Sequence, residues 1–136
     1  MVSRRHATRR AGIGLALLLA GMLAACSTTA PTSVFYLVFF PSDSTELSPI
    51  GRDVVNKAAE DARKQAARQI TVNGYADNVG RLDYNVDLSE RRAAAVKQAL
   101  IESGFPGDQI LALGIDAAKL PDAAAGGRRV EIKLIK

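Results

Sequence analysis

The segment from Gly74 to Val96, GYADNVGRLDYNVDLSERRAAAV, decides the fold because it joins a glycine-containing loop to an amphipathic helix. The run Ile70-Thr71-Val72 precedes it and predicts a strand, and Gly74 is expected to begin the loop. Beyond the loop, five residues recur at the spacing of one helix face: Leu88, Arg92, Val96, Ala99 and Leu100. Ser103-Gly104 is expected to end this helix, because glycine readily adopts the left-handed conformation that follows a helix. The segment therefore predicts a strand, a loop and a helix in succession.

An earlier helix is predicted by a start signal and an apolar repeat. Ser48 followed by Pro49 is typical of a helix start, with the serine as N-cap and the proline in the first helical position. After this start, apolar residues recur every fourth position, with charged residues on the other faces: Ile50, Val54, Ala58 and Ala62. The helix is expected to end near Arg68.

Three further strands complete the predicted domain. Residues 34–40, VFYLVFF, form a continuous apolar and aromatic run, which favours a central, buried strand. Residues 110–115 predict a short strand, and a last strand is indicated by apolar residues that alternate with charged ones: Val130, Ile132 and Leu134. The order is β-α-β-α-β-β. We predict a two-layer α/β (α+β) sandwich, in which two helices cover one face of a mixed four-stranded sheet.

The charge balance excludes a broad nucleic-acid-binding surface. The chain has 136 residues, 18 basic and 14 acidic, for a net charge of +4. Four of the basic residues lie before the domain begins: Arg4, Arg5, Arg9 and Arg10. The remaining 14 Lys and Arg equal the 14 Asp and Glu, because the first 25 residues contain no acidic residue. A neutral domain offers no electrostatic footprint for a phosphate backbone, so we expect no nucleic-acid partner.

Residues 1–25 have the organisation of a secretory signal. A basic start is followed by an apolar run of Ala, Leu, Ile, Met and Gly, shorter than the roughly 20 residues needed to span a bilayer. The run ends in Leu23-Ala24-Ala25-Cys26, which resembles the bacterial lipoprotein box and implies that Cys26 is lipidated. A plain signal peptide with an incidental cysteine is the alternative. Residues 26–33 are then the lipidated cysteine and a flexible tether, and residues 34–136 are the folded domain.

Three groups of residues follow one recognisable pattern. Asn85, Leu88, Ser89, Arg92 and Ala93 fit Asn-x-x-Leu-Ser-x-x-Arg-Ala; Gly74, Asp77 and Gly80 fit an upstream Gly-x-x-Asp-x-x-Gly; residues 128–132 read Arg-Arg-Val-Glu-Ile. The pattern resembles the peptidoglycan-binding domain of the OmpA-like family, with a layout closest to the peptidoglycan-associated lipoproteins. The resemblance covers roughly residues 34–136.

The resemblance implies a ligand, the diaminopimelate of the peptidoglycan stem peptide. It implies that Asp77 meets the ammonium group of this amino acid and that Arg92 meets its carboxylate. Arginine suits the second role because it offers two parallel N–H donors to a carboxylate, which lysine cannot do. Asn85 belongs to the predicted site either as a helix cap or loop clamp or as a direct ligand, and Arg129 is expected to border the site from the last strand.

Neighbouring charged residues are given structural roles. Arg91 is expected to point away from the site, because consecutive helical residues lie about 100° apart. We expect Arg128 to be solvated, Leu88 to pack beneath the site, and the carboxylates of Asp83 and Asp87 to be solvated rather than to act as a pair.

The predicted function is a non-enzymatic outer-membrane lipoprotein that binds peptidoglycan and connects the membrane to the cell wall. The single histidine, His6, lies in the leader, so the mature domain would hold no Ser-His or Cys-His pair, no Cys/His metal site and no cofactor. By resemblance to lipoprotein sorting, the presence of Ser27 rather than Asp directly after the cysteine implies the outer membrane rather than the inner one. The domain is then expected to face the periplasm. The alternative is an envelope-complex adaptor that uses the same fold for protein contacts.

Overall fold

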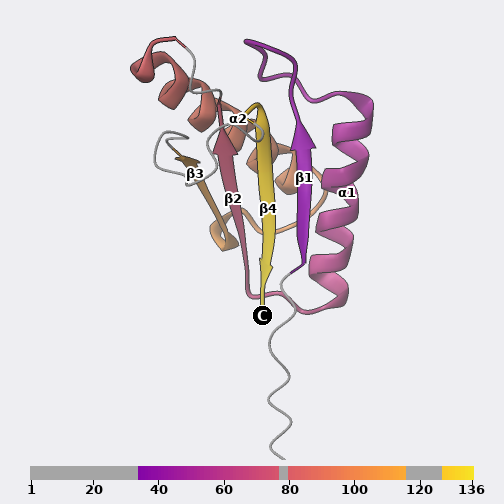
Figure 1. Ribbon diagram of the computed structural model, residues 1–136. Helices are drawn as coiled ribbons and strands as arrows, with labels where there is room; N and C mark the ends of the chain where they lie inside the picture. Colours follow the sequence, from indigo (N-terminus) through magenta and orange to yellow (C-terminus); the bar gives the residue numbers. More distant parts are fainter. Residues whose placement is uncertain (1–33, 77–79, 116–126) are drawn as a thin grey trace, which may run out of the picture. The chain divides into compact units, whose positions relative to one another are not determined.

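The computed structural model describes residues 34–76, 80–115 and 127–136, and its elements follow the predicted order (Figure 1). They are β1 (Phe35–Phe39), α1 (Pro49–Lys64), β2 (Gln69–Tyr75), α2 (Leu82–Glu102), a turn of 3-10 helix (Gly107–Gln109), β3 (Ile110–Ile115) and β4 (Arg129–Ile135). Only the 3-10 turn was not expected. The predicted signal peptide, Cys26 and the tether lie outside the described residues.

The four strands form one mixed sheet in the order β1-β4-β2-β3. β4 is antiparallel to β1 on one side and to β2 on the other, whereas β2 and β3 are parallel. Parallel neighbours need a long crossover connection, and α2 supplies it between β2 and β3. The predicted sandwich of two helices on a mixed four-stranded sheet is confirmed.

The hydrophobic core lies between the helices and one face of the sheet. Alternate strand residues point into it, among them Val38, Ile70, Val72, Val130 and Ile132, and all are almost completely buried. Every residue of the core cluster lies between Val38 and Leu134. A segment that starts after Cys26 therefore contains the whole core and is expected to fold alone.

The prediction of a central position for the first strand is wrong. β1 lies at an edge of the sheet, next to β4. Only its even-numbered residues face the core, while Phe35, Leu37 and Phe39 point to the uncovered face with 54%, 43% and 62% of their surface exposed. An unbroken apolar run is typical of a buried strand, but here it marks a strand that carries apolar residues on both faces.

The predicted apolar face of α1 is displaced by one position. Ile50, expected in the core, is 77% exposed, and Val54 is only partly buried. The buried residues are Gly51, Val55, Ala58, Ala59 and Ala62. A Cβ atom on Gly51 would lie 3.3 Å from Cγ1 of Val38, so the helix approaches the sheet along its smallest residues. The apolar residues that recur every fourth position in the sequence lie beside this buried face and share only Ala58 and Ala62 with it.

The start of α1 is as predicted, but the helix ends four residues before Arg68. Ser48 is the N-cap, and its hydroxyl accepts a hydrogen bond from the backbone N–H of Gly51 at 3.0 Å. At the other end, Ala67 N–H donates to the carbonyl of Ala62 and Ala66 N–H to that of Arg63, which is the Schellman arrangement. It needs a left-handed residue at Ala66, whose φ is +50°.

Two paired glycines let α2 lie close to the sheet. Gly74, expected to begin a loop, lies within β2 and pairs with Gly114 of β3. A Cβ on Gly74 would lie 2.1 Å from the backbone oxygen of Ser89, and one on Gly114 would lie 2.8 Å from the backbone nitrogen of Glu90. Neither position tolerates a side chain, because the helix backbone occupies that space.

A partly buried hydroxyl connects β1 to α1. Tyr36 donates a hydrogen bond of 2.7 Å from its hydroxyl to Oδ2 of Asp61, whose other oxygen accepts from Nζ of Lys57 at 2.7 Å. Burial, together with the hydrogen bond to the Asp61 carboxylate, raises the pKa of Tyr36 to about 12. The hydrogen bond between Tyr36 and Asp61 therefore requires a protonated Tyr36.

Replacing Ala66 by glycine should stabilise the protein, because an L-residue in the left-handed region costs about 1 kcal/mol that glycine does not. We expect the free energy of unfolding in urea to rise by about 0.5–1 kcal/mol. Ala94→Gly is the matched control, since Ala94 is exposed within α2, and it should lower stability by a similar amount. Destabilisation by both variants would show that the left-handed conformation is not strained.

Tyr36→Phe should remove part of the pH dependence of stability in alkaline solution. The folded pKa of about 12 lies above the ordinary value of 10.0, so the stabilisation is complete below about pH 10 and is lost as the pH rises towards 12. Near pH 7 the variant should lose about 1–2 kcal/mol. Urea unfolding of both proteins between pH 7 and 11 tests this, and a constant difference across that range would contradict it.

Candidate functional site

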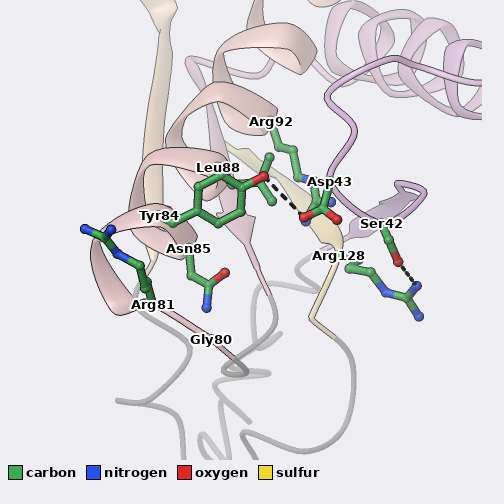
Figure 2. Close-up of a pocket in the computed structure, with 9 residues that line it drawn as sticks. All are labelled: Ser42, Asp43, Gly80, Arg81, Tyr84, Asn85, Leu88, Arg92 and Arg128. Carbon is green, nitrogen blue, oxygen red and sulfur yellow. Dashed lines mark hydrogen bonds between the residues drawn. The ribbon is translucent and has the colours of Figure 1, made fainter.

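A pocket of about 340 Å³ opens where β1 ends and where α2 and β4 begin (Figure 2). Three segments that are distant in sequence form it: the loop after β1, the first turns of α2, and the residue before β4. Its described lining residues are Ser42, Asp43, Gly80, Arg81, Tyr84, Asn85, Leu88, Arg92 and Arg128. Three of them carry guanidinium groups and one carries a carboxylate, so the described lining favours an anionic ligand.

Arg92 lies at the base of this pocket and is completely buried within the fold, with 0% of its surface exposed. Its guanidinium donates to three backbone carbonyls: from Nε to Ser44 at 2.9 Å, from Nη2 to Pro41 at 2.9 Å, and from Nη1 to Tyr75 at 3.4 Å. It also lies 5.4 Å from the centre of the Phe40 ring. These contacts compensate for the loss of water around a buried charge.

Arg92 therefore connects three parts of the chain. It belongs to α2, Pro41 and Ser44 lie in the loop after β1, and Tyr75 is the last residue of β2. Arg91, in contrast, is exposed and pairs with Asp87 at 2.8 Å one turn earlier on the helix. The expectation that Arg92 faces the pocket and Arg91 points away agrees with this placement.

The loop after β1 forms one wall of the pocket. Asp43 has a left-handed backbone, with φ of +52°, and its carboxylate accepts a hydrogen bond from the hydroxyl of Tyr84 at 3.2 Å. Ser42 accepts one from Nη1 of Arg128 at 3.0 Å (Figure 2). Hydrogen bonds from Arg92 and Tyr84 of α2 and from Arg128, which directly precedes β4, thus hold this loop in place.

The structure places the two C-terminal arginines differently from the expectation. Arg129 was expected to border the site, but it pairs with Glu131 at 2.9 Å and stacks on the Tyr75 ring at 4.6 Å, both on the uncovered face of the sheet. Arg128, expected to be only solvated, lines the pocket while remaining exposed. Arg128 directly precedes β4, and its backbone is left-handed, with φ of +66°.

Asn85 and Leu88 both line the pocket. Asn85 is not the helix cap that one expectation allowed, because α2 begins after Arg81 and Asn85 lies at the end of its first turn. Its backbone N–H donates to the carbonyl of Arg81 at 3.1 Å. Leu88 is 4% exposed and packs beneath the site as expected. Asp77, the predicted partner of the ligand's ammonium group, lies outside the described residues.

A second hollow of about 500 Å³ adjoins the first along α2 and is lined by Arg81, Asp83, Tyr84 and Asp87. Asp83 and Asp87 do not form a carboxylate pair: Asp83 binds Arg81 at 2.6 Å and Asp87 binds Arg91. The hydrogen bond from Arg81 lowers the pKa of Asp83. Both carboxylates are exposed, as expected.

Several lining residues were not predicted from the sequence: Ser42, Asp43, Arg81 and Tyr84. Ser42 and Asp43 follow Pro41, and their position in the pocket depends on the long-range contacts of Arg92, for which a local pattern gives no signal. Tyr84 directly precedes Asn85, and this adjacency to a predicted site residue was the one indication in the sequence that it lines the pocket.

Within the described ranges, no helix combines the length and apolar character needed to cross a membrane.

Comparison with known proteins gives a consistent family. The model of the OmpA family matches residues 39–131. "Outer membrane protein A" of Bordetella avium is 36% identical over 103 residues, which cover 71% of this chain and 53% of the relative. "Peptidoglycan-binding protein ArfA" of Mycobacterium tuberculosis is 32% identical over 101 residues, covering 70% of this chain and 31% of the relative. The chain thus spans about half or less of the length of these relatives.

A solved structure shows the same fold. It is the peptidoglycan-associated lipoprotein from Burkholderia pseudomallei, with a TM-score of 0.64 and 25% identity, and the match covers 73% of this chain and 89% of that one. The two-layer arrangement described above is therefore shared over most of both chains.

Arg92→Ala should destabilise the domain, because it leaves three backbone carbonyl groups, two in the loop after β1 and one at the end of β2, without their donor. We expect the free energy of unfolding to fall by about 3–5 kcal/mol, and amide exchange at residues 41–44 to become faster. Arg91→Ala is the matched control and should change stability by less than about 0.5 kcal/mol. Equal stability of the two variants would mean that Arg92 does not hold the loop.

Proposed function

This chain belongs to the OmpA family, and from that premise we propose that it binds peptidoglycan without catalysing a reaction. One relative is named for outer-membrane location, and another is named for peptidoglycan binding. The observation that carries the proposal is the pocket, in which one buried and two exposed arginines meet at the end of the sheet. Stem peptides carry several carboxylates, and such a lining suits them.

The proposed ligand is the diaminopimelate of the stem peptide, bound between Asp77 and Arg92. Arg92 lines the pocket, and its Nη1 lies 3.4 Å from the carbonyl of Tyr75. In the sequence, Asp77 follows Tyr75 by two residues. In the proposed site, a carboxylate and a guanidinium together hold the ammonium and carboxylate groups of one amino-acid centre. Asn85 would line the same cleft.

Arg128 takes the place of Arg129 in the proposed site. It is exposed at the pocket mouth, where it can meet a second carboxylate of the stem, whereas Arg129 is engaged with Glu131 on the uncovered face. Arg92 has a double role, since the same guanidinium fixes the loop that forms the pocket wall. A binding defect of Arg92→Ala would therefore combine a lost contact with a lost wall.

We propose that lipidated Cys26 attaches the protein to the outer membrane, with the domain in the periplasm. The strand direction suits this arrangement: β1 starts at Phe35, beside the C-terminal end of β4 (Figure 1). The pocket is lined by residues that follow the other end of β1. The first residue of β1 and the pocket are thus separated by about the length of the strand, roughly 17 Å.

Calorimetry with residues 27–136 and defined stem peptides tests the proposal. A diaminopimelate-containing peptide should bind, and one with lysine in its place should bind at least about 10-fold more weakly, because it lacks the second zwitterionic centre. Equal affinity for both would contradict the diaminopimelate assignment. No binding to either peptide or to isolated cell walls would favour the alternative, an envelope adaptor that contacts proteins.

Two variants locate the site without disturbing Arg92. Asp77→Asn should weaken binding by about 10-fold or more, and Arg128→Ala by about 3–10-fold, since Arg128 is exposed and its contact is partly screened. Arg129→Ala is the control for Arg128→Ala and should bind like the unmodified domain, because its side chain is on another face. A larger loss for Arg129→Ala than for Arg128→Ala would reverse this assignment.

A further inference from the structure

The uncovered face of the sheet carries two apolar strips separated by polar residues. On β1 the strip consists of Phe35, Leu37 and Phe39, and on β3 of the exposed Leu111 and Leu113. The central strands present polar and charged side chains between them, such as Thr71, Asn73, Glu131 and Lys133. The two helices pack on the opposite face, where Val38 meets Gly51 of α1. Among the described residues, therefore, no helix covers the β1 strip.

The same three residues of β1 also present backbone groups at the edge of the sheet. Phe40 N–H donates to the carbonyl of Arg128 at 2.8 Å, so the even-numbered residues of this segment direct their backbone groups towards β4. In an antiparallel ladder the direction alternates. Phe35, Leu37 and Phe39 therefore direct their N–H and C=O groups outward, and in the described part of the chain no strand pairs with that side.

This edge lacks the usual protection against strand pairing. Exposed edge strands generally carry a charged side chain, a proline or a bulge that prevents another strand from joining. Between Phe35 and Phe39 there is no charged residue, no proline and no glycine. Such a strand is a pairing surface rather than a protected edge.

We propose that β1 pairs with β1 of a second copy of this chain, antiparallel and about a two-fold axis through Leu37. The strand sequence Phe-Tyr-Leu-Val-Phe suits that symmetry, because Phe35 then faces Phe39 of the other copy and the two Leu37 residues face each other. All three outward-directed residues become hydrogen-bonded pairs, and six large apolar side chains form one patch. The result is an eight-stranded sheet.

A second copy fits this surface better than an unrelated strand does, because the pattern of β1 is its own complement under a two-fold rotation. The arrangement also closes at two chains, since a two-fold contact uses the same β1 edge of both copies. The pockets remain outside the contact, because their lining includes no residue of β1. The dimer therefore goes beyond the proposed binding function and does not depend on it.

Sedimentation velocity of residues 27–136, between about 1 and about 300 µM, tests the association, and a reversible monomer–dimer equilibrium is expected. Leu37→Lys should raise the dissociation constant by at least roughly 100-fold, because two like charges would face each other on the axis. Leu111→Lys is the matched control: the two leucines are 43% and 44% exposed on the same face, and only one is on β1. The control should still dimerise.

Three outcomes would overturn the proposal: a monomer at the highest concentration, assembly beyond two chains, or a larger effect of Leu111→Lys than of Leu37→Lys. Circular dichroism establishes that the Leu37→Lys domain is folded, and its stem-peptide affinity should equal that of the unmodified domain. Binding and association are thus measured separately, so that either proposal can fail alone.

Cysteine cross-linking tests the register. Residues 27–136 contain no cysteine, so a single introduced one reports one position. Leu37→Cys should form a disulfide-linked dimer, since hydrogen-bonded antiparallel pairs have Cα atoms about 5.5 Å apart, within the disulfide range. Phe35→Cys and Phe39→Cys should cross-link when mixed but not separately, because equal positions would be roughly 13 Å apart. Cross-linking of Leu111→Cys, or of Phe35→Cys alone, would reject the register.

Discussion

The buried guanidinium of Arg92 is the interaction on which the site depends. It binds the carbonyls of Pro41, Ser44 and Tyr75, and so brings the loop after β1 and the end of β2 to the same point beside α2. Without it, nothing of comparable strength in the described structure would hold the loop as a wall. The charge that makes the pocket attractive to an anion is thus the same charge that gives the pocket its shape.

Arg92 reaches these carbonyls from a helix that lies directly against the backbone of the sheet. Gly74 and Gly114 are paired across β2 and β3, and the space that their side chains would fill is occupied by the backbone around Ser89. This is one turn of α2 before Arg92. The glycines therefore determine the depth of the helix, and the depth of the helix determines where the guanidinium lies.

The sequence predicted those features that are encoded locally. Ser48 and Gly104 have their predicted capping conformations, and the helix face that contains Arg92 is the buried one, because such signals depend on neighbours in the chain. The errors arise where distant contacts decide. Gly74 was interpreted as a loop residue, since a glycine needed for close packing and one needed for a turn look alike in sequence.

The candidate site was predicted in part for the same reason. The helix contributes Asn85, Leu88 and Arg92 at a regular spacing, and these three residues do line the pocket. Arg128 could not be distinguished from Arg129, because the two are adjacent and of the same type, and only their contacts with distant residues show which of them lines the pocket. The assignment of Asp77 remains a prediction, as this residue is not described.

The direction of β1 has a mechanical consequence. A pull between the chain that precedes Phe35 and a ligand beyond Phe39 would act along the strand, parallel to its axis. The hydrogen bonds between β1 and β4 lie perpendicular to that axis, so all five residue pairs of the ladder, from Phe35–Lys133 to Phe39–Arg129, would be sheared together. A sheet pulled in this direction resists far more force than one whose interstrand hydrogen bonds break one after another.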